Sequence, residues 1–166
     1  MAGVSIRLEI DDARIRSTLQ RLIDTVADPS DAMRDIAMLG ESSTRERFRT
    51  EIGPDGKRWK PSLRAQIKGG RTLTMDGHLG DSLSSRFGRD FAEWGVNRPY
   101  AAIHQFGGVI KPRQAKALRF RLANGGFVTT KSVTIPARPY LGISAADEAD
   151  IVDILQRRIQ GALDAG

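Results

Sequence analysis

The feature that most constrains the fold is a change of hydrophobic period along the chain. Apolar residues recur at helical spacing over 11–26, 30–48 and 144–163. Between the last two of these segments, apolar and polar residues alternate in short runs bounded by Gly, Pro, Asn and Asp, which is typical of strands joined by tight turns. The period therefore predicts an α+β fold with an N-terminal helical pair, an antiparallel sheet of hairpins and a C-terminal helix packed across the sheet.

The turn residues divide the predicted elements more finely. A short helix is expected over Tyr100–Phe106, because Pro99 suits its start and Gly107-Gly108 its end. Ser144 and Asp147 form a capping box before the last helix. Gly40, inside the second helix, is expected to let another backbone approach closely. A helical turn is expected at 79–83. The expected strands are 4–10, 82–87, 91–96, 117–122 and 127–130, with an extended segment at 109–110 and a non-ladder path through 135–139.

The segment 50–74 lacks a long apolar stripe and is predicted to be a long basic loop with one helical turn near 63–67. It holds six basic residues between Lys57 and Arg71, together with a tryptophan, Trp59. A loop of this length within a compact domain is typically functional. Trp59 has two interpretations: it pins the loop to the core, or it anchors an interface.

Length and composition narrow the class of protein. With 166 residues the chain suits a single domain, 1–166. The absence of cysteine excludes disulfides, thiolate zinc sites and cysteine nucleophiles. No apolar run reaches the roughly 18–20 residues that span a bilayer, so no membrane partner is expected. The early charges of the N-terminus do not fit a secretory leader, so the protein is expected to stay where it is made.

The charge is unevenly distributed along the chain. Residues 1–55 carry 8 basic and 11 acidic side chains, residues 56–146 carry 16 and 4, and residues 147–166 carry 2 and 5. The stretch from Trp94 to Ala146 has no acidic residue. A basic middle between acidic ends indicates contact with phosphates, head-to-tail docking between copies, or simply a solvated basic face.

Motifs for catalysis and cofactor binding are missing from the sequence. Neither a phosphate-binding P-loop nor a Rossmann glycine pattern is present, and no cofactor is expected. His78 has only Asp76 and Asp81 near it, which is too few ligands to predict a metal site. His104 as a general base with Asp or Ser partners is the enzyme hypothesis. No partner is evident near it in the sequence, so we predict a non-enzymatic protein.

Arg138 lies between two prolines in the stretch IPARPYLG. Rigid flanking residues lower the entropic cost of positioning a guanidinium, which suits a bidentate contact with a carboxylate or phosphate. In the alternative interpretation, the prolines only direct the chain into the last helix. The residues leave both open.

Several pieces, in this order, resemble the phage virion morphogenesis family, also called tail-completion or head–tail joining proteins, over about residues 5–163. The set is more specific than any single piece. The pieces are Pro54–Trp59 (PDGKRW), the segment with Leu73, Gly77, Leu79 and Ser82, Trp94–Val96 (WGV), Tyr100–Gly108 (YAAIHQFGG), Ile135–Gly142 (IPARPYLG) and the closing helix.

The resemblance implies a structural protein of the head–tail neck in tailed phages, prophages or phage-derived particles. Such proteins act as rings, commonly six-fold, around the channel through which DNA leaves. The implied partners are further copies of the chain, with a hexamer as one possible ring, and the neighbouring neck and tail proteins. Non-specific contact with DNA in the channel is implied as well. The implied location is the host cytoplasm during assembly and then the virion neck. The resemblance transfers no catalytic residue.

The candidate residues follow from both lines of reasoning. The rival function is a nucleic-acid-binding module that uses the basic segments 57–71 and 111–121. The candidate interface residues are Trp59, Tyr100, His104, Gln105, Arg138 and Tyr140. The candidates for contact with DNA or an acidic partner are Lys57, Arg58, Lys60, Arg64, Lys68, Arg71, Lys111, Arg113 and Lys116.

Overall fold

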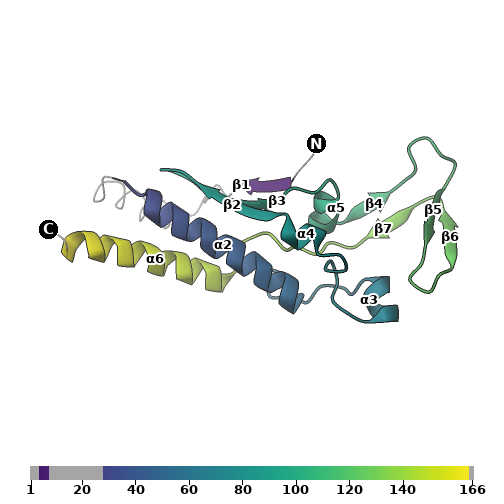
Figure 1. Ribbon diagram of the computed structural model, residues 1–166, viewed down its shortest axis with the longest axis horizontal. Coiled ribbons are helices and arrows are strands. Elements are labelled where there is room, and N and C mark those ends of the chain that lie inside the picture. Colours follow the sequence, from purple (N-terminus) through teal and green to yellow (C-terminus); the bar gives the residue numbers. More distant parts are fainter. Residues whose placement is uncertain (1–3, 8–27, 165–166) are drawn as a thin grey trace.

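The computed structural model describes residues 4–7 and 28–164, which form an elongated molecule (Figure 1). Two long antiparallel helices, α2 (Ser30–Thr50) and α6 (Ala145–Asp164), occupy one end. The remaining elements are β1 (Val4–Arg7), α3 (Leu63–Lys68), α4 (His78–Asp81), β2 (Leu83–Phe87), β3 (Ala92–Val96), α5 (Ala101–Phe106), β4 (Gly108–Ile110), β5 (Leu118–Arg121), β6 (Phe127–Thr130) and β7 (Val133–Ile135). The predicted α+β class is confirmed.

The strands form three separate antiparallel sheets. The largest has the order β1-β3-β2, while β4 pairs with β7 and β5 with β6. Both predicted hairpins are therefore confirmed, although they do not share one sheet. The pairing of β4 with β7 was not expected, because three-residue strands are too short to show alternation. Ile135 pairs with Gly108, so the predicted non-ladder path is wrong for Ile135.

The long helix α2 is the centre of the helical end. One side of α2 packs on β2 and β3, and the other packs on α6. The expectation that the last helix packs across the sheet is wrong, because α2 lies between them (Figure 1). The α2–α6 contact buries a cluster of aliphatic side chains: Ala32, Met33, Ile36, Ile151, Ile154 and Leu155.

Gly40 explains how closely α2 approaches the sheet. A Cβ at this position would lie 2.3 Å from Cδ2 of Trp94, inside the indole ring. The space left by the missing side chain is thus filled by a buried aromatic ring on β3. The expected close approach is present, but a side chain makes it rather than a backbone.

The second core cluster joins the end of α2 to the middle of the molecule. It gathers side chains from α2, the 50–74 loop, the sheet, α5 and the segment before α6: Phe48, Trp59, Leu79, Leu83, Trp94, Val96, Ala101, Tyr140 and Leu141. The loop is anchored to this core by Trp59, and its predicted helical turn is confirmed as α3. Residues far apart in sequence are therefore held together here.

Other predictions meet the structure less completely. The helix expected at 11–26 lies outside the described residues, so half of the predicted helical pair stays a prediction, as does the single domain over 1–166. The strand expected at 4–10 is confirmed over Val4–Arg7. The helical turn expected at 79–83 is α4, which begins one residue earlier and ends two earlier. Among the described residues, no helix is long and apolar enough to cross a membrane.

Candidate interaction site

The two stretches singled out in the sequence contact each other in what we call the joint, residues 101–107 and 137–142. The side chain of Gln105 bridges them. Its Oε1 accepts hydrogen bonds from the backbone N–H groups of Tyr140 and Leu141, both at 3.0 Å, and its Nε2 donates to the carbonyl of Leu141 at 2.9 Å. The Tyr140 hydroxyl donates to the carbonyl of Ala101 at 3.0 Å. The side chains thus satisfy buried backbone groups that no strand partner reaches.

The backbone at the end of α5 fits closely into the joint. The N–H of Arg138 donates to the carbonyl of His104 at 2.7 Å. Gly107 has a φ of +70°, and a Cβ there would lie 2.7 Å from the backbone nitrogen of Ala137. Any side chain at Gly107 would meet both backbone strain and a clash. This explains the glycine that ends α5.

Arg47 connects the joint to both long helices. Its Nη1 donates to the carbonyls of Tyr140 at 3.1 Å and Gly142 at 2.8 Å, and its Nη2 pairs with Asp147 at the start of α6. Burial lowers the pKa of Arg47, and the charge of Asp147 partly offsets that effect. Sequence reasoning missed this role of Arg47. The available signal was position, because Arg47 lies three residues after the buried Thr44 on the same helix stripe.

Asp147 also completes the predicted capping box. Its Oδ2 accepts from the backbone N–H and the hydroxyl of Ser144, both at 2.7 Å, and its own N–H donates to the Ser144 Oγ at 3.2 Å. Burial alone would raise the pKa of Asp147. The hydrogen bonds with Ser43 and Ser144 and the charge of Arg47 outweigh burial and hold that pKa below its ordinary value. Asp147 is therefore ionised at neutral pH.

Four of the six candidate interface residues lie in the interior of the chain: Trp59, Gln105, Arg138 and Tyr140. Trp59 is only 4% exposed, and its Nε1 donates to the carbonyl of Pro139 at 2.9 Å. Arg138 donates from Nε to the backbone carbonyl of Lys60 at 2.7 Å. Burial lowers the pKa of Arg138, and the charge of the Glu51 carboxylate partly offsets that effect. These side chains hold the loop to the joint, and because they are buried they present little surface to another molecule.

Tyr100 and His104 are the two candidates that reach the surface. Tyr100 is 42% exposed, and its ring meets the His104 ring edge-on with 6.0 Å between centroids. Burial and the charge of Arg138 lower the pKa of His104. Its buried Nδ1 has no hydrogen-bond partner within residues 4–7 and 28–164. No Asp or Ser side chain in this part of the chain thus forms a hydrogen bond with that Nδ1.

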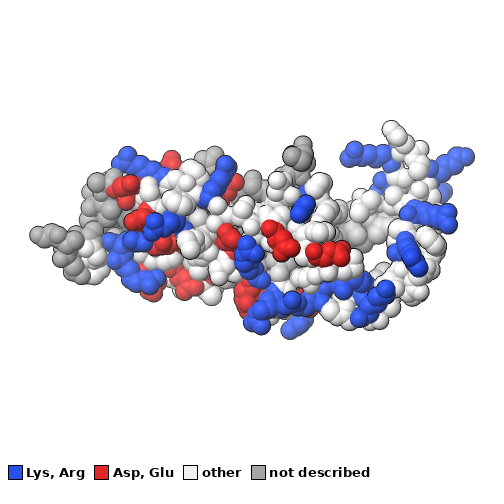
Figure 2. Space-filling view, viewed as in Figure 1, with Lys and Arg blue, Asp and Glu red and all other residues white. Residues whose placement is uncertain are grey.

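A second region of interest is what we call the arm, residues 108–135, in which no residue is buried. The arm comprises the β4–β7 pair and the β5–β6 hairpin. It projects from the end of the molecule opposite the two long helices (Figure 1). In Figure 2 the arm is covered by basic and uncharged residues. Its basic residues, all exposed, are Lys111, Arg113, Lys116, Arg119, Arg121 and Lys131. None of them forms an ion pair with another of the described residues, so no described carboxylate neutralises their charge.

The β5–β6 hairpin has two different faces. Phe120 pairs with Val128 in the register, and they share one face with Leu118. Arg119 and Arg121 point to the other face, where the Arg119 guanidinium lies 4.8 Å from the centroid of the Phe127 ring. Phe127 remains 63% exposed. A lone two-stranded hairpin is marginally stable in water, so this ribbon has much to gain from a covering partner.

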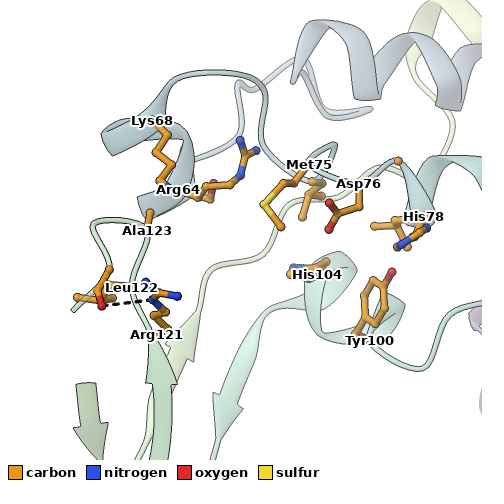
Figure 3. A pocket seen from close by; sticks show the side chains of 15 residues that line it. Arg64, Lys68, Met75, Asp76, His78, Tyr100, His104, Arg121, Leu122 and Ala123 are labelled. Atoms are coloured by element: carbon orange, nitrogen blue, oxygen red, sulfur yellow. Dashed lines mark hydrogen bonds between the residues drawn. The ribbon is translucent and has the colours of Figure 1, made fainter. Parts of the chain in front are cut away.

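A cleft of about 710 Å³ separates the arm from the rest of the molecule (Figure 3). Arg64 and Lys68 of α3 and Arg121 of the arm line it, together with His78 and His104. The two basic segments predicted as a nucleic-acid surface thus face one another. Arg64 also donates to the carbonyls of Gly69 and Arg71.

The remaining candidate cations lie outside the cleft lining. Those of the loop are exposed on the surface around Trp59 and after α3: Lys57, Arg58, Lys60 and Arg71. Those of the arm are exposed between β4 and β5: Lys111, Arg113 and Lys116. His78 and His104 share the cleft with Asp76, yet the described part of the chain holds no group of three side chains able to bind a metal ion.

Comparison with known proteins identifies relatives along almost the whole chain. The phage virion morphogenesis family matches residues 10–160. "Mu-like prophage FluMu G protein 2" of Haemophilus influenzae is 36% identical over 156 residues, which cover 93% of this chain and 96% of that protein. "Putative capsid assembly protein G" of Escherichia phage Mu is 30% identical over 172 residues, which cover 97% and 98%. No solved structure matches the chain.

Proposed function

Because the chain belongs to the phage virion morphogenesis family, we propose that it is a tail-completion protein that joins head and tail in a phage or phage-like particle. A structural role in phage virion assembly is common to the family. The proposal adds that the protein is located in the neck between head and tail and that it acts there as a ring of identical subunits. The proposed role is non-enzymatic, and the proposed partners are further copies of the chain and the neighbouring neck and tail proteins.

The arm is the observation that carries this proposal. An assembly subunit needs a surface that its own fold leaves unsatisfied. The arm offers exposed apolar side chains among six cations that form no ion pair with the described part of the chain. The arm also projects from one end of an elongated body (Figure 1). A subunit with distinct surfaces at its two ends makes heterologous contacts, which close into a ring when the rotation between copies allows.

Electron microscopy of particles assembled without this protein tests the proposed function. We expect separate heads and tails, and we expect joined particles to return when the wild-type protein is supplied. A variant lacking the arm residues 111–131, replaced by a short Gly-Ser linker, should fail to restore joining even though it is expressed and folded. Joined particles in the absence of the protein would contradict the proposal.

A second candidate function is contact with DNA through the cleft. The observation that favours it is that α3 and the arm bring Arg64, Lys68 and Arg121 to one concave surface. Phosphate binding releases counterions, so affinity for duplex DNA should fall steeply with salt. A gel-shift titration at low salt should then show binding that Lys68→Glu with Arg121→Glu removes. A flat titration for the wild-type protein would exclude this candidate.

A further inference from the structure

The outer face of α6 complements the arm in charge. Residues 145–156 contain no Lys or Arg. Three carboxylates in this stretch are exposed, those of Glu148, Asp150 and Asp153. Within the described residues no ion pair involves them, whereas Asp147 is committed to Arg47 in the interior. The first half of α6 is therefore an acidic surface whose charge no other described residue neutralises.

The same face of α6 also offers an apolar contact point. Val152 is 37% exposed and lies four residues after Glu148, so the two side chains are neighbours on the helix. On the arm, Phe120, Phe127, Val109 and Ile110 are likewise exposed among cations. Both surfaces thus combine unpaired charge of one sign with exposed apolar area.

We propose that the arm of one copy docks on this acidic outer face of α6 in a second copy. The arm points away from the long helices of its own chain (Figure 1), so it does not cover its own α6. DNA would use the cations of the arm but not the aliphatic side chains of Val109 and Ile110. A protein surface uses both, and an acidic one avoids like-charge repulsion.

This inference rests on the proposed function, since it assigns the two surfaces that meet in the ring. The arm and α6 are different surfaces, so each copy keeps one of the two free after the first contact. The contact therefore propagates until a ring closes. Because opposite charges contribute to it, self-association should weaken as salt increases.

A charge-swap experiment tests the pairing. The arm variant carries Arg119→Glu and Arg121→Glu, and the helix variant carries Glu148→Lys and Asp153→Lys. All four side chains are exposed, so both variants should fold, as circular dichroism will verify. Size-exclusion chromatography with light scattering at low salt should show assembly of the wild-type protein. Each variant alone should associate on the order of a hundredfold more weakly, because like charges then face each other.

The decisive measurement is the equimolar mixture of the two variants. Each contact in the mixture again joins opposite charges, so assembly should recover, a result that misfolding or general charge effects would not produce. A matched control, Arg45→Glu with Arg49→Glu, makes the same change of charge at two exposed positions of α2, outside the arm, and should assemble like the wild-type protein.

Several outcomes would overturn the inference. They are a wild-type protein that stays monomeric at high concentration and low salt, variants that assemble normally, a mixture that does not recover, and a control that fails equally. An arm variant that loses only DNA binding would assign the arm to DNA instead. None of these outcomes changes the expected separation of heads and tails in particles lacking the protein, so the proposed function is tested separately.

Discussion

The joint and the arm are built from similar short segments, yet they treat their polar and apolar side chains in opposite ways. In the joint, Gln105 and Arg138 are buried and spend their hydrogen bonds on backbone groups of the same chain. In the arm, Arg119 and Phe127 are exposed, and the guanidinium of Arg119 lies over the ring of Phe127. Polar side chains that hydrogen-bond to backbone therefore mark the interior of this protein, and cations beside exposed apolar residues mark the surface that we propose for partners.

This difference has an energetic reason. A buried donor or acceptor that loses its partner costs about 1–3 kcal/mol, so every polar group of the joint depends on the others. Side chains on the arm are solvated in the isolated chain, so their loss should cost folding little. Substitutions in the two regions should therefore separate stability from assembly.

The largest effect is expected for Arg47→Met, which breaks the link between the joint and the two long helices. The substitution leaves Asp147 buried with its main charge partner gone and the carbonyls of Tyr140 and Gly142 without a donor. Removing one partner of a buried ion pair costs about 3–5 kcal/mol, which urea unfolding will measure. The control Arg49→Met removes an exposed arginine from the same helix and should change stability little. Equal effects of the two substitutions would refute the central place of Arg47.

The next-largest loss of stability is expected for Gln105→Leu within the joint. The N–H groups of Tyr140 and Leu141 would lose their acceptor in a buried environment, at about 1–3 kcal/mol for each group. Gln114→Leu is the matched control, because Gln114 is exposed on the arm. If the Gln105 variant is as stable as the control, other groups or water must replace the hydrogen bonds of the Gln105 amide.

A smaller effect should appear when the pH falls. The pKa of His104 is lowered in the folded protein by burial and by the charge of Arg138. Below pH 6.5, the ordinary pKa of histidine, the unfolded chain therefore binds more protons at this residue than the folded protein does. Acidification from neutral pH toward pH 5 should therefore destabilise the fold. Urea midpoints across this range should fall less for His104→Gln than for the wild-type protein. Parallel pH profiles would mean that His104 titrates alike in both states.

The smallest effect on stability is expected for Phe127→Ser on the arm. The ring is 63% exposed, so the free energy of unfolding should change by no more than about 0.5 kcal/mol. Self-association should nevertheless weaken, which sedimentation at low salt will show. A loss of stability comparable to that of the Gln105 variant would place the arm inside the cooperative fold and remove the contrast between the regions.

Much of the fold was predictable from local patterns. The amphipathic stripe of α2, the hairpins at β2–β3 and β5–β6, the short α5 and the capping box at Ser144 and Asp147 all follow from periodicity and turn chemistry. Three features do not follow from these patterns. They are the pairing of β4 with β7, the packing of α6 on α2 and the insertion of Trp94 at Gly40. Each of these depends on contacts between distant segments, which periodicity alone does not reveal.

The candidate site was predictable only in part. The Tyr100–Gly108 and Ile135–Gly142 stretches were recognised in the sequence as two pieces of the family resemblance. The sequence did not show that Gln105 bridges them by hydrogen bonds to backbone. Arg121 was within a predicted basic segment, but its place opposite Arg64 and Lys68 depends on how the arm bends. The cations of the loop and arm were singled out by the uneven charge along the chain, but the sequence left open whether they contact a partner or only solvent.

Hydrogen exchange of the wild-type protein, compared between monomer at high salt and assembly at low salt, tests the central claim most directly. The amides of Tyr140 and Leu141 in the joint should exchange slowly in both states, because Gln105 holds them within each chain. The amides of 118–130 in the arm should exchange rapidly in the monomer and become protected on assembly. Arm protection that does not change on assembly, or joint amides that become protected only then, would contradict the account.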